Sequence, residues 1–490
     1  MSAKSARRGG AVSGVLDRYF EITSRGSSIS QEVRGGIVSF FAMAYIIVLN
    51  PLIIGGFSTE QAAVDVEGNW LPNAQVAAVT ALVGGLMTIM MGLVAKVPFA
   101  LAAGLGINSF LAFSLVGQIT WPEAMGLVLI NGVLIVIFGL TGLRQMIFNA
   151  VPAPLKSAIA VGIGLFIAFI GFVGGGFVRS TGAQSPPVQL GDGGSITTLP
   201  TLTFVLGIII MGVLMARRVK GALLIGIAVT TIIAIVIEAV AHLGLAIGDN
   251  TTGWSLTEPV LPATIVSVPD FSLIGNVSFG AFERIGILGA TMFIFTLLFM
   301  NFFDAMGAMT GLARQAGIAT PDGTFPRLKR ALVVEGIGAV AGGGASASSN
   351  TVFIDSAAGI GEGARTGLAS IVTGLLFLVA MFFSPLTQIV PLEVASAALV
   401  VVGALMIAQI ADIDFTDFRI ALPAFLTIVV MPFTYNIANG IGVGFISWVL
   451  VHAVTGRVKS VSWLLWIVAA LFAVFFAREP LTELFAAINT

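Results

Sequence analysis

The stretch AGGGASASSNTVFIDSAAGIGEGARTG, residues 341–367, decides how this chain folds. It lies between two strongly apolar runs, so we expect it at membrane depth. It is nevertheless rich in Gly and Ser, and it carries Asn350, Asp355, Glu362 and Arg365. Irregular backbone and bare carboxylates persist at that depth only where protein or a water-filled cavity surrounds them. The rest of the chain is therefore expected to house this stretch and a partner segment.

The composition is that of a membrane protein. Of the 490 residues, 57% are hydrophobic and only 10% are charged, whereas soluble domains are about 25% charged. Repeated apolar runs of about 17–25 residues indicate transmembrane α-helices rather than the short alternating segments of a β-barrel. The chain has no Cys, and its two histidines stand at the ends of apolar runs. We therefore expect no metal site, no cofactor and no disulfide, and the polar, basic first 31 residues predict no cleaved leader.

Lys and Arg alternate along the chain with acidic or uncharged loops. Basic residues cluster before the first apolar run, at 217–220, at 314–330 and at 457–459, and these positions are expected to be cytoplasmic. The acidic loops, above all 243–284, are expected outside. This pattern fits seven segments, an outside loop and seven more, so the second half would be an inverted repeat of the first.

A second broken segment supports the repeat. PFALAAGLGINSFLAFS, residues 98–114, is apolar but interrupted by glycines, and it is third in its half, as 344–364 is in the other. Inverted repeats bring such segments face to face near the bilayer midplane, each as an extended half followed by a half-helix. We expect the first break at 104–108, with Asn108 opening the half-helix, and extended backbone at 348–353. The alternative for the glycines alone is close helix packing.

One carboxylate stands in the middle of a long apolar run. In LLFMNFFDAMGAMTG, residues 297–311, Asp304 shares a helical face with small residues and with Asn301. No Lys or Arg lies in the apolar middle of any run, so an acid facing a cavity there could exchange protons with water. Among the remaining acids, Glu362 is expected to pair with Arg365, and Glu335 to be interfacial. Phe353 could stack on a planar ligand or pack in the core.

Several motifs together resemble one known family, the adenine/guanine/hypoxanthine permease branch of the nucleobase–cation symporter-2 (xanthine/uracil permease) family. They run in order through most of the chain, and the stretch after Phe353 is the most specific. They are FFAMAYIIVLNP (40–51), GLGINSFLAF (104–113), FDAMGAMTG (303–311), PDGTFPRLKRA (321–331), FIDSAAGIGEGARTGLASIVTGLLF (353–377) and PAFLTIVVMPFTYNIANGIGVGFISWVL (423–450).

The resemblance implies an all-α polytopic fold of fourteen transmembrane segments, with core and gate domains and short strands in segments three and ten. The implied division is a cytoplasmic N-terminal segment (1–31), core segments 1–4 (32–147), gate segments 5–7 (148–242), an extracytoplasmic loop (243–285), core segments 8–11 (286–392), gate segments 12–14 (393–455) and a C-terminal apolar or interfacial segment (456–490).

The resemblance also implies a site between the two domains. Its acids in segments eight and ten are Asp304 and Asp355, which are expected both to bind the base and to couple protons. The full expected substrate-binding set is Asp304, Asp355, Phe353, Asn108, Ile354, Ile46 and Ser109. Asp stands at 355 where this branch more often has Glu, and Ala stands at 308 where Thr is usual, which leaves the preferred purine open.

The resulting hypothesis is a secondary transporter, not an enzyme, that imports hypoxanthine, guanine or adenine with a proton by alternating access. It would be a multi-pass protein of the plasma (bacterial inner) membrane with a cytoplasmic N-terminus. Its partners would be the base, the proton and the bilayer, not nucleic acid, with a homodimer left open. Three alternative functions remain. The first is an anion or carboxylate carrier of the same architecture, which the paired acids disfavour. The others are a channel and an intramembrane enzyme, and the enzyme would need a histidine or lysine at membrane depth.

Overall fold

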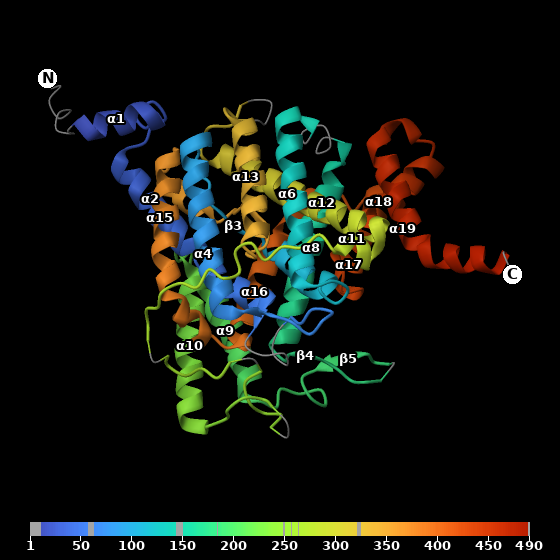
Figure 1. Ribbon diagram of the computed structural model, residues 1–490, viewed down its shortest axis with the longest axis horizontal. Coiled ribbons are helices and arrows are strands. Elements are labelled where there is room, and N and C mark those ends of the chain that lie inside the picture. The colour runs from blue at the N-terminus through green and yellow to red at the C-terminus, as the bar shows by residue number, and fades with distance from the viewer. Residues whose placement is uncertain are drawn as a thin grey trace.

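The computed structural model describes residues 11–56, 63–143, 150–183, 185–247, 250–255, 257–262, 264–320 and 325–488, with the backbone alone at 11–13, 303 and 478–488. Within this part of the chain, ten helices are long and apolar enough to cross a membrane, and three shorter apolar helices accompany them. The chain is therefore a multi-pass membrane protein of mostly helical structure. In Figure 1 the spans stand upright, α1 lies across their upper ends, and the β4–β5 hairpin lies at the lower end.

The first half contains short helices at its broken segment and long helices elsewhere. Its elements are α1 (Ala11–Phe20), α2 (Ile29–Met43), α3 (Ile46–Ile54), β1 (Gly55–Gly56), β2 (Leu71–Pro72), α4 (Asn73–Met90), η1 (Met91–Ala95), β3 (Leu101–Ala103), α5 (Leu105–Phe110), η2 (Leu111–Leu115), α6 (Trp121–Thr141), α8 (Ala153–Gly174), β4 (Val178–Ser180), β5 (Val188–Leu190), α9 (Leu199–Ala216) and α10 (Ala222–Ala241).

The second half repeats the order of long helix, long helix, strand and short helix. Its elements are α11 (Ala281–Arg284), α12 (Gly286–Gln315), α13 (Leu328–Gly344), β6 (Asn350–Val352), α14 (Ser356–Gly361), α15 (Gly367–Ala380), η3 (Met381–Ile389), α16 (Leu392–Ile407), η4 (Ala408–Asp412), α17 (Phe418–Phe433), α18 (Ile437–Val454), η5 (Val458–Ser460) and α19 (Trp463–Ile488).

The helices pack in two groups. The first group contains α2–α6 and α12–α15, with α6 against α13 and α15 against α4 and α2. The second group contains α8–α10 and α16–α18, with α16 against α8 and α9, and α17 against α8 and α18. Glycines allow the helices to approach closely. A Cβ on Gly85 of α4 would lie 2.9 Å from the carbonyl oxygen of Gly374 in α15. A Cβ on Gly132 of α6 would lie 2.5 Å from the backbone nitrogen of Val340 in α13. Small residues permit this close approach inside a bilayer, where apolar burial contributes little to helix association.

The two broken segments meet as a short antiparallel sheet, as predicted. Strands β3 and β6 pair with Ala102 opposite Thr351. The pairing continues at both ends, because Gly104 donates to the Ser349 carbonyl at 3.0 Å and Phe353 donates to the Ala100 carbonyl at 3.0 Å. The sheet thereby satisfies backbone groups that the interrupted helices leave unpaired at membrane depth. The first half-helix begins at Leu105, three residues before Asn108, so the predicted opening residue was wrong.

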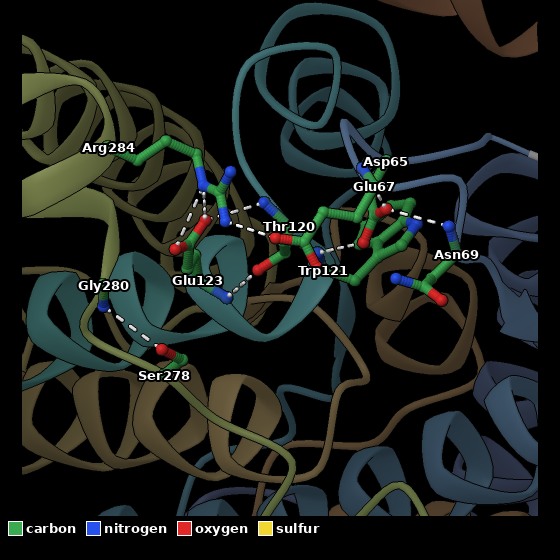
Figure 2. A network of polar contacts seen from close by, with 9 residues as sticks. All are labelled: Asp65, Glu67, Asn69, Thr120, Trp121, Glu123, Ser278, Gly280 and Arg284. Atoms are coloured by element: carbon green, nitrogen blue, oxygen red, sulfur yellow. Dashed lines mark hydrogen bonds and ion pairs between the residues drawn. The ribbon is translucent and has the colours of Figure 1, made fainter.

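A polar network joins three acidic loops at one end of the molecule (Figure 2). Arg284 bridges Glu67 at 2.5 Å and Glu123 at 2.9 Å. Glu123 is also part of a capping box with Thr120 at the start of α6. Nearby, Asp65 accepts hydrogen bonds from the backbone N–H groups of its own loop and of the α6 start. The loops before α4, before α6 and before α12 therefore lie on one side.

Basic residues cluster at the opposite end of the molecule. Glu21 lies 2.6 Å from Arg327, and Arg25 donates to the Lys96 carbonyl at 2.8 Å. Glu362 pairs with Arg34 at 2.9 Å and with Lys220. This second pair links the first helix group to the turn between α9 and α10 of the second group.

One prediction about the acids was wrong. Glu362 pairs with Arg34 and Lys220, whereas the Arg365 guanidinium donates to the carbonyls of Ile360 and Ala364. Glu335, which was expected to be interfacial, is 0% exposed within α13.

The C-terminal apolar or interfacial segment expected at 456–490 forms helix α19. This helix packs on α18 through a buried face made of Leu465, Val468, Ala469 and Phe472. A Cβ on Gly442 of α18 would lie 2.6 Å from the Phe472 ring. The second half of this helix runs away from the body (Figure 1).

Arg284→Ala is expected to destabilise the first helix group by about 2 kcal/mol, because it leaves Glu123 with little solvent and no counter-charge. The Glu123 side chain is 7% exposed, whereas Glu67 is 52% exposed. Glu67→Gln removes the solvent-exposed partner and is the matched control, expected to have a small effect. Melting temperatures of the detergent-solubilised variants measure this difference, and equal shifts for the two variants would contradict it.

Candidate functional site

The site is built where the strand pair crosses the middle of α12. Asp304 lies near the centre of this 30-residue helix and is exposed, as are Gly307 and Gly311 one and two turns further on. Ile354, which follows β6 closely, is 55% exposed and lies next to Gly311. Together these residues define an open surface that continues along α12 toward the basic end of the molecule. We call it the crevice.

Asp355 is the second carboxylate at the crevice. It is half-buried and immediately precedes α14. Its Oδ2 atom accepts a hydrogen bond of 3.2 Å from the Tyr45 hydroxyl, which stands at the break between α2 and α3. Tyr45 is also within electrostatic reach of Asp304. Three elements distant in sequence thus bring two acids and a phenol together.

Strand β6 is buried throughout, and its polar side chains alternate between the side of Asp304 and the side of α13. Thr351 lies beside Asp304, and its hydroxyl has no partner with hydrogen-bond geometry among the described residues. Asn350 has the opposite orientation: it packs against Gly338 of α13 and is 0% exposed. The alternation of strand side chains explains this division. Of the polar residues in this strand, Thr351 is therefore the one beside Asp304, where it is 1% exposed.

The other predicted contacts lie behind the crevice surface. Ile46 and Asn108 are 0% exposed, Ser109 is 1% exposed and Phe353 is 8% exposed. The Ser109 hydroxyl donates to the Leu105 carbonyl of its own helix at 2.9 Å. Neither polar atom of the Asn108 side chain has a partner among the described residues. The crevice surface therefore combines Asp304, Ile354 and Asp355, with the other four in the layer beneath.

Two asparagines hold the segment that leads into β6. Asn50 donates to Thr80 at 2.7 Å and to the Ala347 carbonyl at 3.2 Å. Asn301 donates to the Ser349 hydroxyl at 3.0 Å and is fully buried. Asn301 was expected on the same face as Asp304, and both side chains meet the segment at β6, Asn301 at Ser349 and Asp304 at Thr351. These amides brace the backbone on which Thr351 and Asp355 are mounted.

Tyr45 and Thr351 were absent from the predicted set of binding residues. The signal for Tyr45 was available, because the chain has only 3 Tyr and this one stands in an apolar run before a proline. A buried phenol usually finds a hydrogen-bond partner. The signal for Thr351 was strand alternation, which puts it on the side of Phe353.

Four aromatic rings meet where the two helix groups adjoin. The Tyr435 ring, between α17 and α18, meets Phe113, Phe166 and Phe169 in edge contacts with centroid distances of 5.7, 5.6 and 5.9 Å. Phe113 belongs to the first helix group, whereas Phe166 and Phe169 belong to α8 of the second. We call these four rings the aromatic plug. It spans the junction of the two groups.

This architecture is typical of a membrane transporter, because two interrupted segments pair as short strands between the long helices and carry a carboxylate at the start of a half-helix, near a second carboxylate on α12. The model of the xanthine/uracil permease family, described as "Permease family", matches residues 30–443. The chain is 35% identical to the guanine/hypoxanthine permease PbuG of Bacillus subtilis, covering 94% of this chain and 99% of that one. It is 34% identical to the adenine permease AdeP of Escherichia coli, covering 94% and 95%. The chain therefore belongs to the nucleobase–cation symporter-2 (xanthine/uracil permease) family.

Solved structures share the fold. The transmembrane domain of the cyanobacterial bicarbonate transporter BicA superposes with a TM-score of 0.60 at 15% identity, covering 84% of this chain and 96% of that one. Murine Slc26a9, an anion transporter in the inward-facing state, gives a TM-score of 0.57 at 10% identity, covering 93% and 74%. At these identities the likeness describes the fold alone.

Proposed function

We propose that this protein imports purine nucleobases, among hypoxanthine, guanine and adenine, together with a proton. The observation that carries the proposal is the pair Asp304 and Asp355 on one mid-membrane surface, with Tyr45 bridging to Asp355. The groups that act most strongly on the two carboxylates do not include Lys or Arg. Relatives named guanine/hypoxanthine and adenine permeases supply the substrate class.

A purine suits this surface because it is planar, uncharged and rich in donors and acceptors. The carboxylates accept its N–H groups, and the Thr351 hydroxyl, which acts on Asp304 from the layer beneath, helps to position that carboxylate. Ile354 offers apolar contact at the crevice surface, and Phe353 lies directly behind it. Asn108, with two unpaired polar atoms, becomes available if the half-helix rearranges around the ligand. Protonation of Asp304 or Asp355 would couple binding to the proton gradient.

We further propose fourteen segments in a seven-plus-seven inverted repeat, with the first helix group as core (32–147 and 286–392) and the second as gate (148–242 and 393–455). Packing supports the repeat. Under an exchange of halves, the pair α4–α15 corresponds to α13–α6, and α17–α18 corresponds to α9–α10; each of these pairs is in contact. The β3–β6 pair corresponds to itself, as strands on a local two-fold axis must.

Transport would follow from movement of the core against the gate. The basic end is assigned to the cytoplasm, together with the N-terminus, because positively charged loops remain inside. The crevice then opens inward, and the aromatic plug closes the outer side. The Glu362–Lys220 ion pair joins core and gate at the inner end and must break or shift if the two move apart.

The test is uptake of labelled hypoxanthine, guanine and adenine into proteoliposomes under an imposed pH gradient. We expect uptake to rise when the lumen is alkaline and to fall to the level without a gradient when a protonophore is added. Replacing external sodium by potassium at constant pH gradient is the control and should leave the rate unchanged. Uptake that ignores the pH gradient would contradict proton coupling, and no uptake of any of the three bases would contradict the substrate class.

A further inference from the structure

The outer end of the second helix group contains a cavity that the central site does not use. Its volume is about 640 Å³, and Phe169, Tyr435, Leu392, Arg179, Asp192 and Ser255 are among its lining residues. This volume falls within the range of roughly 300–1,000 Å³ that is usual for small-molecule sites. The β4–β5 hairpin, the end of α8 and the start of α16 form its walls, at the lower end of the molecule in Figure 1.

We propose that this cavity is a second binding site for a planar, uncharged heterocyclic base, a waiting position on the outer side of the aromatic plug. The proposal deepens the proposed function, on which its substrate class rests. Two features of the cavity carry it: a pair of opposite charges that are farther apart than a hydrogen bond, and aromatic faces.

Arg179 and Asp192 supply the opposite charges. Their closest atoms, Nε and Oδ1, are 3.7 Å apart, which is longer than a hydrogen bond. Their side chains are 39% and 53% exposed. The guanidinium can therefore donate to a ligand carbonyl or ring nitrogen, and the carboxylate can accept from an N–H group. Since both signs are present, the site favours an uncharged ligand with donors and acceptors over an anion or a cation.

Buried acceptors lie behind the α16 side of the cavity. Glu393 is 2% exposed; its Oε1 atom accepts from the Ser255 N–H at 3.0 Å, and its Oε2 atom has no partner among the described residues. The Ser396 hydroxyl, one turn further along α16, also lacks a described partner. It lies against Gly174, which lines the cavity. Neither Glu393 nor Ser396 is among the lining residues, so these oxygens lie in the layer behind the wall that Ser255 and Gly174 form.

The plug itself supplies the aromatic faces. Tyr435 and Phe169 line the cavity, and the Tyr435 ring is in edge contact with Phe113 of the first helix group. Tyr435 has φ +52, in the left-handed region that bulky residues rarely adopt, so its position is imposed by its surroundings. Helix α5 and η2 run continuously from Asn108 to Phe113. A base on Tyr435 would thus contact the ring that touches Phe113, on the same helical segment as Asn108.

The absence of cysteine from the chain permits a direct test. Ser255→Cys places one thiol in the cavity, and a membrane-impermeant thiol reagent measures its accessibility from outside. The measurement is made in the Asp304→Ala background, which removes the central site. At hypoxanthine ten times above the dissociation constant of the outer site, labelling should slow about tenfold. Thr251→Cys, on the exposed loop nearby and outside the cavity lining, is the matched control and should label at an unchanged rate.

A second variant tests use of the cavity in transport. Arg179→Gln, with Asp304 intact, should raise the KM for uptake severalfold and leave the maximal rate unchanged. The outer site is overturned if the parent chain transports hypoxanthine but hypoxanthine does not protect the thiol of the Ser255→Cys variant. It is also overturned if Arg179→Gln leaves the KM unchanged. In both cases the proposed function stands. If the parent chain transports no purine while hypoxanthine protects that thiol, the proposed function fails and the outer site stands.

Discussion

Asparagine in place of Asp304 is expected to reduce kcat/KM for purine uptake about 100-fold, the loss of about 3 kcal/mol that follows removal of a charged hydrogen-bond partner. The substitution preserves shape but removes the group that can take up and release a proton. It should also remove the response of the remaining uptake to the pH gradient. Because Asp304 is exposed to the crevice, the fold does not depend on its charge, and the melting temperature should change little.

The measurement is the initial rate of labelled hypoxanthine uptake with and without the gradient, at equal protein in the liposomes. Asp414→Asn is the matched control, because Asp414 is an exposed acid in the loop between η4 and α17. It should transport as the parent chain does. Asp304→Asn with a normal rate and a normal gradient response would exclude Asp304 from both binding and coupling. A collapse of the melting temperature would instead identify Asp304 as a structural residue.

The sequence predicts the placement of the site because the hydrocarbon core of a bilayer tolerates few charged groups and little irregular backbone. A polar, glycine-rich stretch and a lone acid within apolar runs have few structural solutions, and crossing broken helices are one of them. The pairing of 98–114 with 341–367 follows from their matching order in the two halves, and β3 and β6 confirm the short strands. The contact between Tyr45 and Asp355 spans 310 residues. No local pattern specifies a contact over that separation.

Helical spacing predicts neighbours only as far as the helix extends. Asn301 and Asp304 are three residues apart in α12, which leaves about 60° between them on a helix. Both side chains therefore meet the segment at β6, Asn301 at Ser349 and Asp304 at Thr351. Glu362 and Arg365 were paired by the same rule, but α14 ends at Gly361 and Gly363 has φ +101. With no helix between them, Glu362 meets Arg34 and Lys220 instead.

Gly342→Ala is expected to damage both stability and transport. A Cβ at this position would collide with the Ser348 carbonyl oxygen and would lie 3.3 Å from the Asn350 nitrogen. The segment after α13 folds back on the helix end here, with the Ala347 N–H donating to the Gly342 carbonyl at 2.8 Å. Backbone cannot yield as a flexible side chain can, so β6 must shift. Overpacking of this kind costs about 1–3 kcal/mol.

Transport should suffer more than stability, because β6 carries Thr351 beside Asp304 and leads directly to Asp355. A displacement of about 1 Å at a site of fixed geometry can cost about 100-fold in rate. Gly344→Ala, two residues on, is the matched control, because its Cβ would meet nothing within 4 Å. Uptake rates and melting temperatures of the two variants should therefore diverge. If they agree, the glycine run serves only helix packing; if Gly342→Ala loses uptake while keeping most of its melting temperature, the run sets the position of the strand that bears the site.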